Sequence, residues 1–166
     1  VMTARTLVEH DPNYSYVTAR LLLDSLRSEA LSFLGIAEAA THTEMHYRYA
    51  ATLKPYIEKG VDLGLLSPHL LEYDLNVLAE ALKADRDQQF TYLGLQTLYD
   101  RYFIHSEGVR FELPQVFFMR VAMGLASNED NREQRAIEFY NLISSFDYMV
   151  STPQLFNSGT LRPQLS

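Results

Sequence analysis

The sequence contains neither cysteine nor tryptophan among its 166 residues. The lack of cysteine excludes disulfide bonds, thiolate metal ligands and a thiol nucleophile within this chain. Basic residues are also few, because 14 Lys and Arg stand against 21 Asp and Glu, which gives a formal net charge of −7. Nucleic acids and anionic membranes attract basic surfaces, so neither is expected as a partner.

Long apolar runs are missing as well. No stretch of about 18 apolar residues occurs, so no transmembrane helix is predicted. The chain does not start with a charged region followed by an apolar one, which argues against secretion and favours a cytoplasmic location. The 47% apolar and 12% aromatic content is typical of a chain that folds around a core. The length of 166 residues predicts a single domain.

Apolar residues recur at helical spacing through most of the chain. Asp11 is a suitable cap for a first helix, and Gly35 favours its end. A second helix is expected over residues 44–59, with Gly60 as its stop signal. Pro55 predicts a kink or a break within this helix, because proline lacks the amide hydrogen that helices need.

Shorter elements follow. Ser67 and Asp74 are suitable caps for two short helices, and residues 85–87 form a polar break. A further helix is expected over residues 92–102, and residues 105–108 predict the turn of a short β-hairpin.

The last part of the chain begins with an apolar helix. Pro114 fits its first turn, and apolar residues surround most of its circumference up to Ala126, which predicts a buried helix. One more helix is expected around residues 136–143, and the pattern breaks after Asp147. Residues 157–159 predict a turn. The fold class is therefore mainly α, a multi-helix domain with one short β-hairpin and an extended C-terminal segment.

His42 and His46 are four residues apart, so on a helix they share one face at the spacing of metal ligands. The pattern is not that of a metalloprotease, because Glu44 stands one place too late, and the nearby sequence offers no obvious third ligand. A solvated helix start is the favoured interpretation, and no metal site is predicted.

Other polar and aromatic groups have simple structural explanations. Asp62, Glu72 and Asp74 form an acidic cluster, but helix capping explains them better than acid–base catalysis. Several tyrosines suggest base stacking or a radical carrier, yet a core or interface role with a bonded hydroxyl is favoured. These tyrosines are Tyr47, Tyr49, Tyr92, Tyr99, Tyr102, Tyr140 and Tyr148.

Thr152 and residues 157–160 are the most suggestive polar segment. Hydroxyls and amide groups in a turn can hold phosphate oxygens, although a plain loop is the favoured interpretation of the local pattern alone. No glycine-rich phosphate loop is present in the sequence.

Four segments, in this order, resemble the large (alpha) subunit of ribonucleotide reductases. They are DPNYSYVTARLLL at 11–23, DRDQQFTYLGLQTLYDRY at 85–102, ELPQVFFMRVAMGLA at 112–126 and STPQLFNSGTLRPQLS at 151–166. The resemblance covers nearly the whole chain. It implies an all-helical N-terminal domain over residues 1–148, followed at 149–166 by the truncated start of the catalytic barrel, whose first strand would be the extended segment.

The family reduces ribonucleotides to deoxyribonucleotides for DNA synthesis, using a thiyl radical and a reducing pair of cysteines. The resemblance gives Thr152 and Ser166 contacts with the substrate and assigns no catalytic residue to this chain. Ser166 matches a serine shortly before one of the reducing cysteines. The regulatory ATP-binding cone is not part of the match, and Ser28 stands where the family has a basic residue that contacts an adenine nucleotide.

The function implied by the resemblance is a share in ribonucleoside-diphosphate reduction, with the isolated chain inactive because it has no cysteine. The expected partners are the remainder of the large subunit, a radical-generating small subunit and a ribonucleoside diphosphate. This chain is expected to bind no cofactor, whereas the complete enzyme would use a dimetal small subunit and nucleotide effectors. The alternative is a non-catalytic helical module that only binds a complementary chain, arising from a split gene, processing or splicing.

Overall fold

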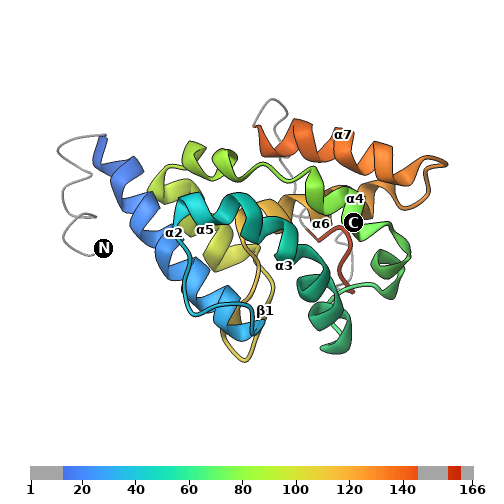
Figure 1. Ribbon diagram of the computed structural model, residues 1–166, viewed down its shortest axis with the longest axis horizontal. Helices are drawn as coiled ribbons and strands as arrows, with labels where there is room; N and C mark the ends of the chain where they lie inside the picture. The colour runs from blue at the N-terminus through green and yellow to red at the C-terminus, as the bar shows by residue number, and fades with distance from the viewer. Residues whose placement is uncertain (1–12, 146–156, 162–166) are drawn as a thin grey trace.

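A computed structural model of the chain describes residues 13–145 and 157–161 (Figure 1). The described residues are mainly helical, with one two-stranded antiparallel sheet, which confirms the predicted fold class. The predicted barrel strand remains untested. The elements are α2 (Asn13–Phe33), α3 (His42–Asp62), η1 (Pro68–Glu72), α4 (Leu75–Glu80), η2 (Ala84–Gln89), α5 (Tyr92–Arg101), β1 (His105–Ser106), β2 (Val109–Arg110), α6 (Pro114–Ala126) and α7 (Arg132–Ser144).

Helix α6 lies at the centre of the core. Pro114 occupies its first turn, as the sequence predicts, and nearly every residue up to Met123 is buried. Helix α7 packs along α6, while α3, η1 and η2 contact other parts of it (Figure 1). An apolar surface all around a helix requires such enclosure, because each exposed side would cost hydrophobic free energy.

Helix α3 corrects the predicted stop at Gly60 and decides against a break at Pro55, where the sequence predicts a kink or a break. It runs unbroken from His42 to Asp62, so neither a break at Pro55 nor a stop at Gly60 occurs. Gly60 lies inside the helix against the side chain of Leu66, where an added Cβ would overlap it. The backbone instead leaves the helix through Gly64, which has a φ of +73° that glycine adopts without strain.

The other boundaries agree well with the predictions. Ser67 and Asp74 cap η1 and α4 with their side chains. The hairpin turn is tighter than expected, because only Glu107 and Gly108 form it, with φ values of +51° and +83°. Residues 85–87 are not a simple break but part of η2, and Asp87 is buried. The predicted cap Asp11, the break after Asp147 and Tyr148 lie outside the described residues.

The segment 157–161 lies against the helical domain. Its turn is the one predicted, with Gly159 at a φ of +81°. Thr160 forms an isolated antiparallel bridge with Leu66, which lies in the loop after α3. A turn late in the chain is thus paired with the loop between α3 and η1.

Candidate functional site

The loop of residues 65–67 holds the segment 157–161 by main-chain hydrogen bonds. The Ser67 amide donates to the Gly159 carbonyl at 3.0 Å, and the Leu161 amide donates to the Leu65 carbonyl at 3.1 Å. Such bonds fix the backbone direction of the segment without depending on its side chains. The loop therefore sets the path of the chain at residues 159–161, a few residues after Thr152 in the sequence.

Helix α6 forms the other side of this holding site. An added Cβ on Gly124 would overlap the Ser158 Oγ and the Gly159 nitrogen, so the segment lies directly against the helix backbone. Gly159 is equally constrained, because its Cβ would lie 2.8 Å from the Arg120 carbonyl oxygen. Close contact between two backbones is a reason for glycine on both sides.

A buried ion pair between Arg120 and Glu112 contacts the segment 157–161 through the Ser158 carbonyl. We call Glu112, Arg120 and Tyr56 the Arg120 cluster. Arg120 donates to both Glu112 carboxylate oxygens at 3.0 Å and, through Nη1, to the Ser158 carbonyl at 3.0 Å. Glu112 also accepts from the Ile104 amide at 2.7 Å and from the Tyr56 hydroxyl. Burial, reinforced by the Glu112 carboxylate, raises the pKa of Tyr56 well above its usual value, so the hydroxyl stays protonated and donates.

A second buried cluster lies at the start of α6. We call Asp87, Tyr49, Gln115 and Tyr140 the Asp87 cluster. Asp87 accepts from the Tyr49 hydroxyl at 2.6 Å and from the Gln115 amide at 2.8 Å, while the Tyr140 hydroxyl donates to Gln115 at 2.6 Å. The nearest cation is Arg27, whose Nη2 lies 3.8 Å away. Burial raises the pKa of Asp87 to about 6 despite these donors.

A cavity of about 300 Å³ adjoins the held segment, between η1, α6 and residues 158–160. Tyr73 at its wall donates to the Met123 carbonyl at 2.6 Å, and the Arg132 guanidinium stacks over the Tyr73 ring. Arg132 also donates to the Glu72 carbonyl at 2.5 Å and lies near two carboxylates. This cation is therefore engaged within the protein.

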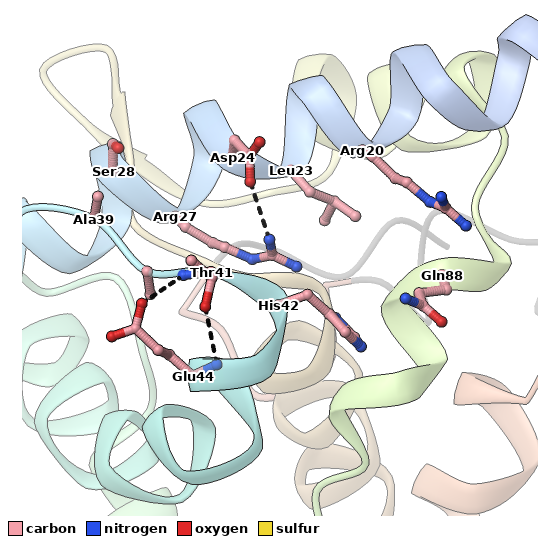
Figure 2. Close-up of a pocket in the computed structure, with 11 residues that line it drawn as sticks. Arg20, Leu23, Asp24, Arg27, Ser28, Ala39, Thr41, His42, Glu44 and Gln88 are labelled. Carbon is pink, nitrogen blue, oxygen red and sulfur yellow. Dashed lines mark hydrogen bonds and ion pairs between the residues drawn. The ribbon is translucent and has the colours of Figure 1, made fainter.

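A larger cavity of about 580 Å³ lies between α2, the start of α3 and η2 (Figure 2). Arg27 crosses it and donates to Asp24 at 3.2 Å, while Thr41 and Glu44 form a reciprocal cap at the start of α3. Ser28, which stands where the resembling family has a basic residue, lines this cavity.

His42 and His46 meet a third polar group that the nearby sequence did not reveal. Asp85, from η2, places its Oδ1 3.1 Å from the Nε2 of His42 and 3.0 Å from the Nε2 of His46. The hydrogen bond to the Thr43 carbonyl raises the pKa of His46, and the bonds from His42 and His46 lower that of Asp85. A separation of about forty residues hides this group from any local pattern.

The remaining predicted residues have the following places. Asp74 caps α4, Glu72 bonds His69 at 2.7 Å, and Asp62 is exposed at the end of α3. The predicted capping role is confirmed for Asp74, whereas neither Glu72 nor Asp62 is a cap. Of the predicted core tyrosines, Tyr49, Tyr92 and Tyr140 are buried, Tyr99 and Tyr102 are half-buried, and Tyr47 is exposed. Thr152 and Ser166, the predicted substrate contacts, lie outside the described residues.

The structure is a helical domain that holds a short turn of its own chain, and comparison of the sequence with known proteins shows what the domain resembles. Residues 88–163 match the family model described as "Ribonucleotide reductase, all-alpha domain". This range contains α5, α6, α7 and the held segment. Within the described residues, no helix is both long enough and apolar enough to cross a membrane.

Comparison with individual proteins extends the match to the whole chain. The chain is 46% identical over 166 residues to the ribonucleoside-diphosphate reductase subunit alpha of Chlamydia trachomatis and 38% identical over 169 residues to that of Helicobacter pylori. It is 30% identical over 164 residues to the large subunit of Caenorhabditis elegans. It spans only 15% of the first relative and 20% of the other two. The predicted resemblance is confirmed, and the chain matches part of a ribonucleotide reductase large subunit.

Proposed function

We propose that this chain takes part in ribonucleoside-diphosphate reduction as the helical N-terminal part of a reductase large subunit. In this role it acts together with the remainder of the large subunit and a radical-generating small subunit, in the cytoplasm. Its own share is structural and positional, because it has no cysteine to carry the redox chemistry. The proposed division is a helical domain over residues 1–148 and the start of the barrel over 149–166.

The holding of residues 158–161 is the observation that carries this proposal. Two main-chain bonds to the loop 65–67 and one bond from Arg120 fix the segment at its described end. Thr152 lies only six residues before Ser158 in the sequence. Limiting the paths open to these residues would favour one orientation of the Thr152 hydroxyl toward a substrate diphosphate. Preorganised donors need little reorganisation when a substrate binds.

The proposal is tested by Thr152→Ala in the large subunit that carries this chain, assayed with its small subunit and a ribonucleoside diphosphate. Loss of one hydrogen bond to a charged group costs about 1.5–3 kcal/mol, which corresponds to a roughly tenfold or greater rise in KM. We expect the rate at saturating substrate to fall much less than KM rises, because the contact is made in the ground state as well as in the transition state.

The control variant is Thr97→Ala, which removes a hydroxyl that donates to the Leu93 carbonyl within α5. It should leave KM unchanged. An unchanged KM for Thr152→Ala in a fully assembled enzyme would contradict the substrate-contact role. Activity of the 166-residue chain alone would contradict the positional role, and an enzyme that is equally active without this chain would favour the alternative of a non-catalytic binding module.

A further inference from the structure

Two helical histidines and a carboxylate from a distant element converge on one point. His42 and His46 lie one turn apart at the start of α3, and Asp85 lies in η2. Their nearest ligand atoms are separated by 3.1 and 3.0 Å from Nε2 to Oδ1, and all three ligand atoms lie within 4.8 Å of one another. Figure 2 shows the His42 ring between the start of α3 and η2.

We propose that His42, His46 and Asp85 bind a divalent transition-metal ion, with zinc as the best fit, that joins the start of α3 to η2. Zinc lies about 2.0–2.2 Å from nitrogen and oxygen ligands, so tetrahedral ligands are about 3.3 Å apart. The observed nitrogen-to-oxygen separations need to open by only a few tenths of an ångström. Two imidazoles favour zinc over magnesium or calcium, which prefer oxygen ligands.

The hydrogen bonding of His46 supports this assignment. Its Nδ1 lies 3.1 Å from the Thr43 carbonyl oxygen, which can only accept, so Nδ1 carries a hydrogen. In the neutral ring, the lone pair is therefore on Nε2 and faces the Asp85 oxygen. Two lone pairs at 3.0 Å repel unless a proton or a cation lies between them. The Thr43 carbonyl also fixes the ring orientation, as the neighbours of metal-bound histidines usually do.

Access and charge are also compatible with an ion. The side-chain exposures of His42, His46 and Asp85 are 26%, 50% and 74%, so an ion can enter and a water molecule can complete the coordination. The amino end of α3 is electropositive, but Glu44 in its first turn and the Asp85 carboxylate offset this charge. The His42 Nδ1 is buried without a hydrogen-bond partner, so we expect weaker binding than in a site whose ligands are all supported from behind.

A metal ion at this position would have a structural effect. Asp85 links η2 to the start of α3 through its hydrogen bonds with His42 and His46. Asp87, two residues later, carries the buried cluster beneath α6. An ion would therefore stiffen the element that delivers Asp87 to the core.

Titration of the 166-residue chain with zinc, measured by isothermal calorimetry, tests the site directly. No cysteine is present to compete for zinc. We expect one zinc ion per chain, and affinity at least about tenfold weaker in His46→Ala and in Asp85→Asn. His69→Ala is the matched control, because the exposed pair of His69 with Glu72 has no third ligand among the described residues. This variant should bind zinc as the original chain does. Circular dichroism checks that each variant is folded.

Failure of the folded original chain to bind zinc, or equal binding by Asp85→Asn, would overturn the proposal and leave a hydrogen-bonded cluster. A second measurement uses the complete large subunit, in which other zinc sites cancel between variants. After zinc loading and desalting, Asp85→Asn should retain less zinc than the original subunit, by up to one equivalent. Equal zinc content would also overturn the proposal.

Discussion

The Arg120 cluster and the Asp87 cluster both bury a carboxylate against α6, but they neutralise it differently. Glu112 meets the Arg120 guanidinium through two bonds of 3.0 Å, and neither side chain is exposed. Asp87 depends mainly on the neutral donors Tyr49 and Gln115, with Arg27 at 3.8 Å. Burial raises the pKa of Asp87 to about 6, which indicates that its carboxylate charge is incompletely compensated.

The two clusters therefore differ in how much stability depends on a single side chain. Removing one partner of a close buried ion pair strongly destabilises the fold, because the other charge is left buried without compensation. A carboxylate held by neutral donors loses one bond at a time. The Arg120 cluster also reaches the held segment through Ser158, so it couples the core to the proposed functional end of the chain.

The largest effect is expected from Arg120→Met. It leaves the Glu112 carboxylate buried without its cation, and the free energy of unfolding should fall by about 3–5 kcal/mol. Urea unfolding of the chain, followed by circular dichroism, measures this loss. Adding Glu112→Gln to Arg120→Met should restore part of the stability, because it removes the stranded charge. Arg135→Met is the control, since its exposed pair with Glu138 contributes at most about 1 kcal/mol. A loss below that level for Arg120→Met would contradict the comparison.

A smaller effect is expected from Tyr49→Phe in the Asp87 cluster. It removes one donor to a buried carboxylate, which costs about 1.5–3 kcal/mol of unfolding free energy, while Gln115 continues to donate. Tyr99→Phe serves as the control, because Tyr99 is half-buried and donates to Glu29 near the surface, so its loss should be smaller. If Tyr49→Phe destabilised the chain more than Arg120→Met, the two clusters would have been ranked wrongly.

The smallest of the three effects is expected from Gly124→Ala. The added methyl group would overlap Ser158 and Gly159, so the segment must move or the helix must shift, at a cost of about 1–3 kcal/mol. Gly94→Ala in α5 is the matched control: its Cβ would contact only the Thr91 hydroxyl, at 3.3 Å, and its effect should stay within about 0.5 kcal/mol. Protection of the Leu161 amide from hydrogen exchange should fall in Gly124→Ala alone. Unchanged protection there would show that the segment is not held by α6.

Local patterns predicted most of the helices because each depends on neighbouring residues. Ser67, Asp74 and Pro114 are at the helix starts where the sequence placed them. The errors arose where tertiary packing outweighs a local preference. Gly60 stays helical because Leu66 packs against it, and Pro55 is accommodated within a helix whose interior face is buried.

The sites were less predictable than the helices. The sequence around Asp85 and Asp87 predicts only a polar break. In the structure, Asp85 is exposed beside two histidines, whereas Asp87 is buried under α6. Arg120 and Glu112 lay within a recognised family segment, but their pairing needed the structure. No spacing rule identifies partners that are 38 to 43 residues apart, such as Tyr49 with Asp87 or His42 with Asp85.

The helical class, most helix boundaries, the lack of thiol chemistry and the resemblance to ribonucleotide reductase large subunits could all be predicted from the amino-acid sequence. Each of these follows from composition, from contacts within a few residues or from the order of family segments. Which polar groups meet could be seen only in the folded structure. The buried Arg120 and Asp87 clusters, the convergence of His42, His46 and Asp85, and the holding of residues 157–161 all join distant parts of the chain. The two buried clusters form because packing around α6 excludes water, so a carboxylate there is stabilised by partners within the protein.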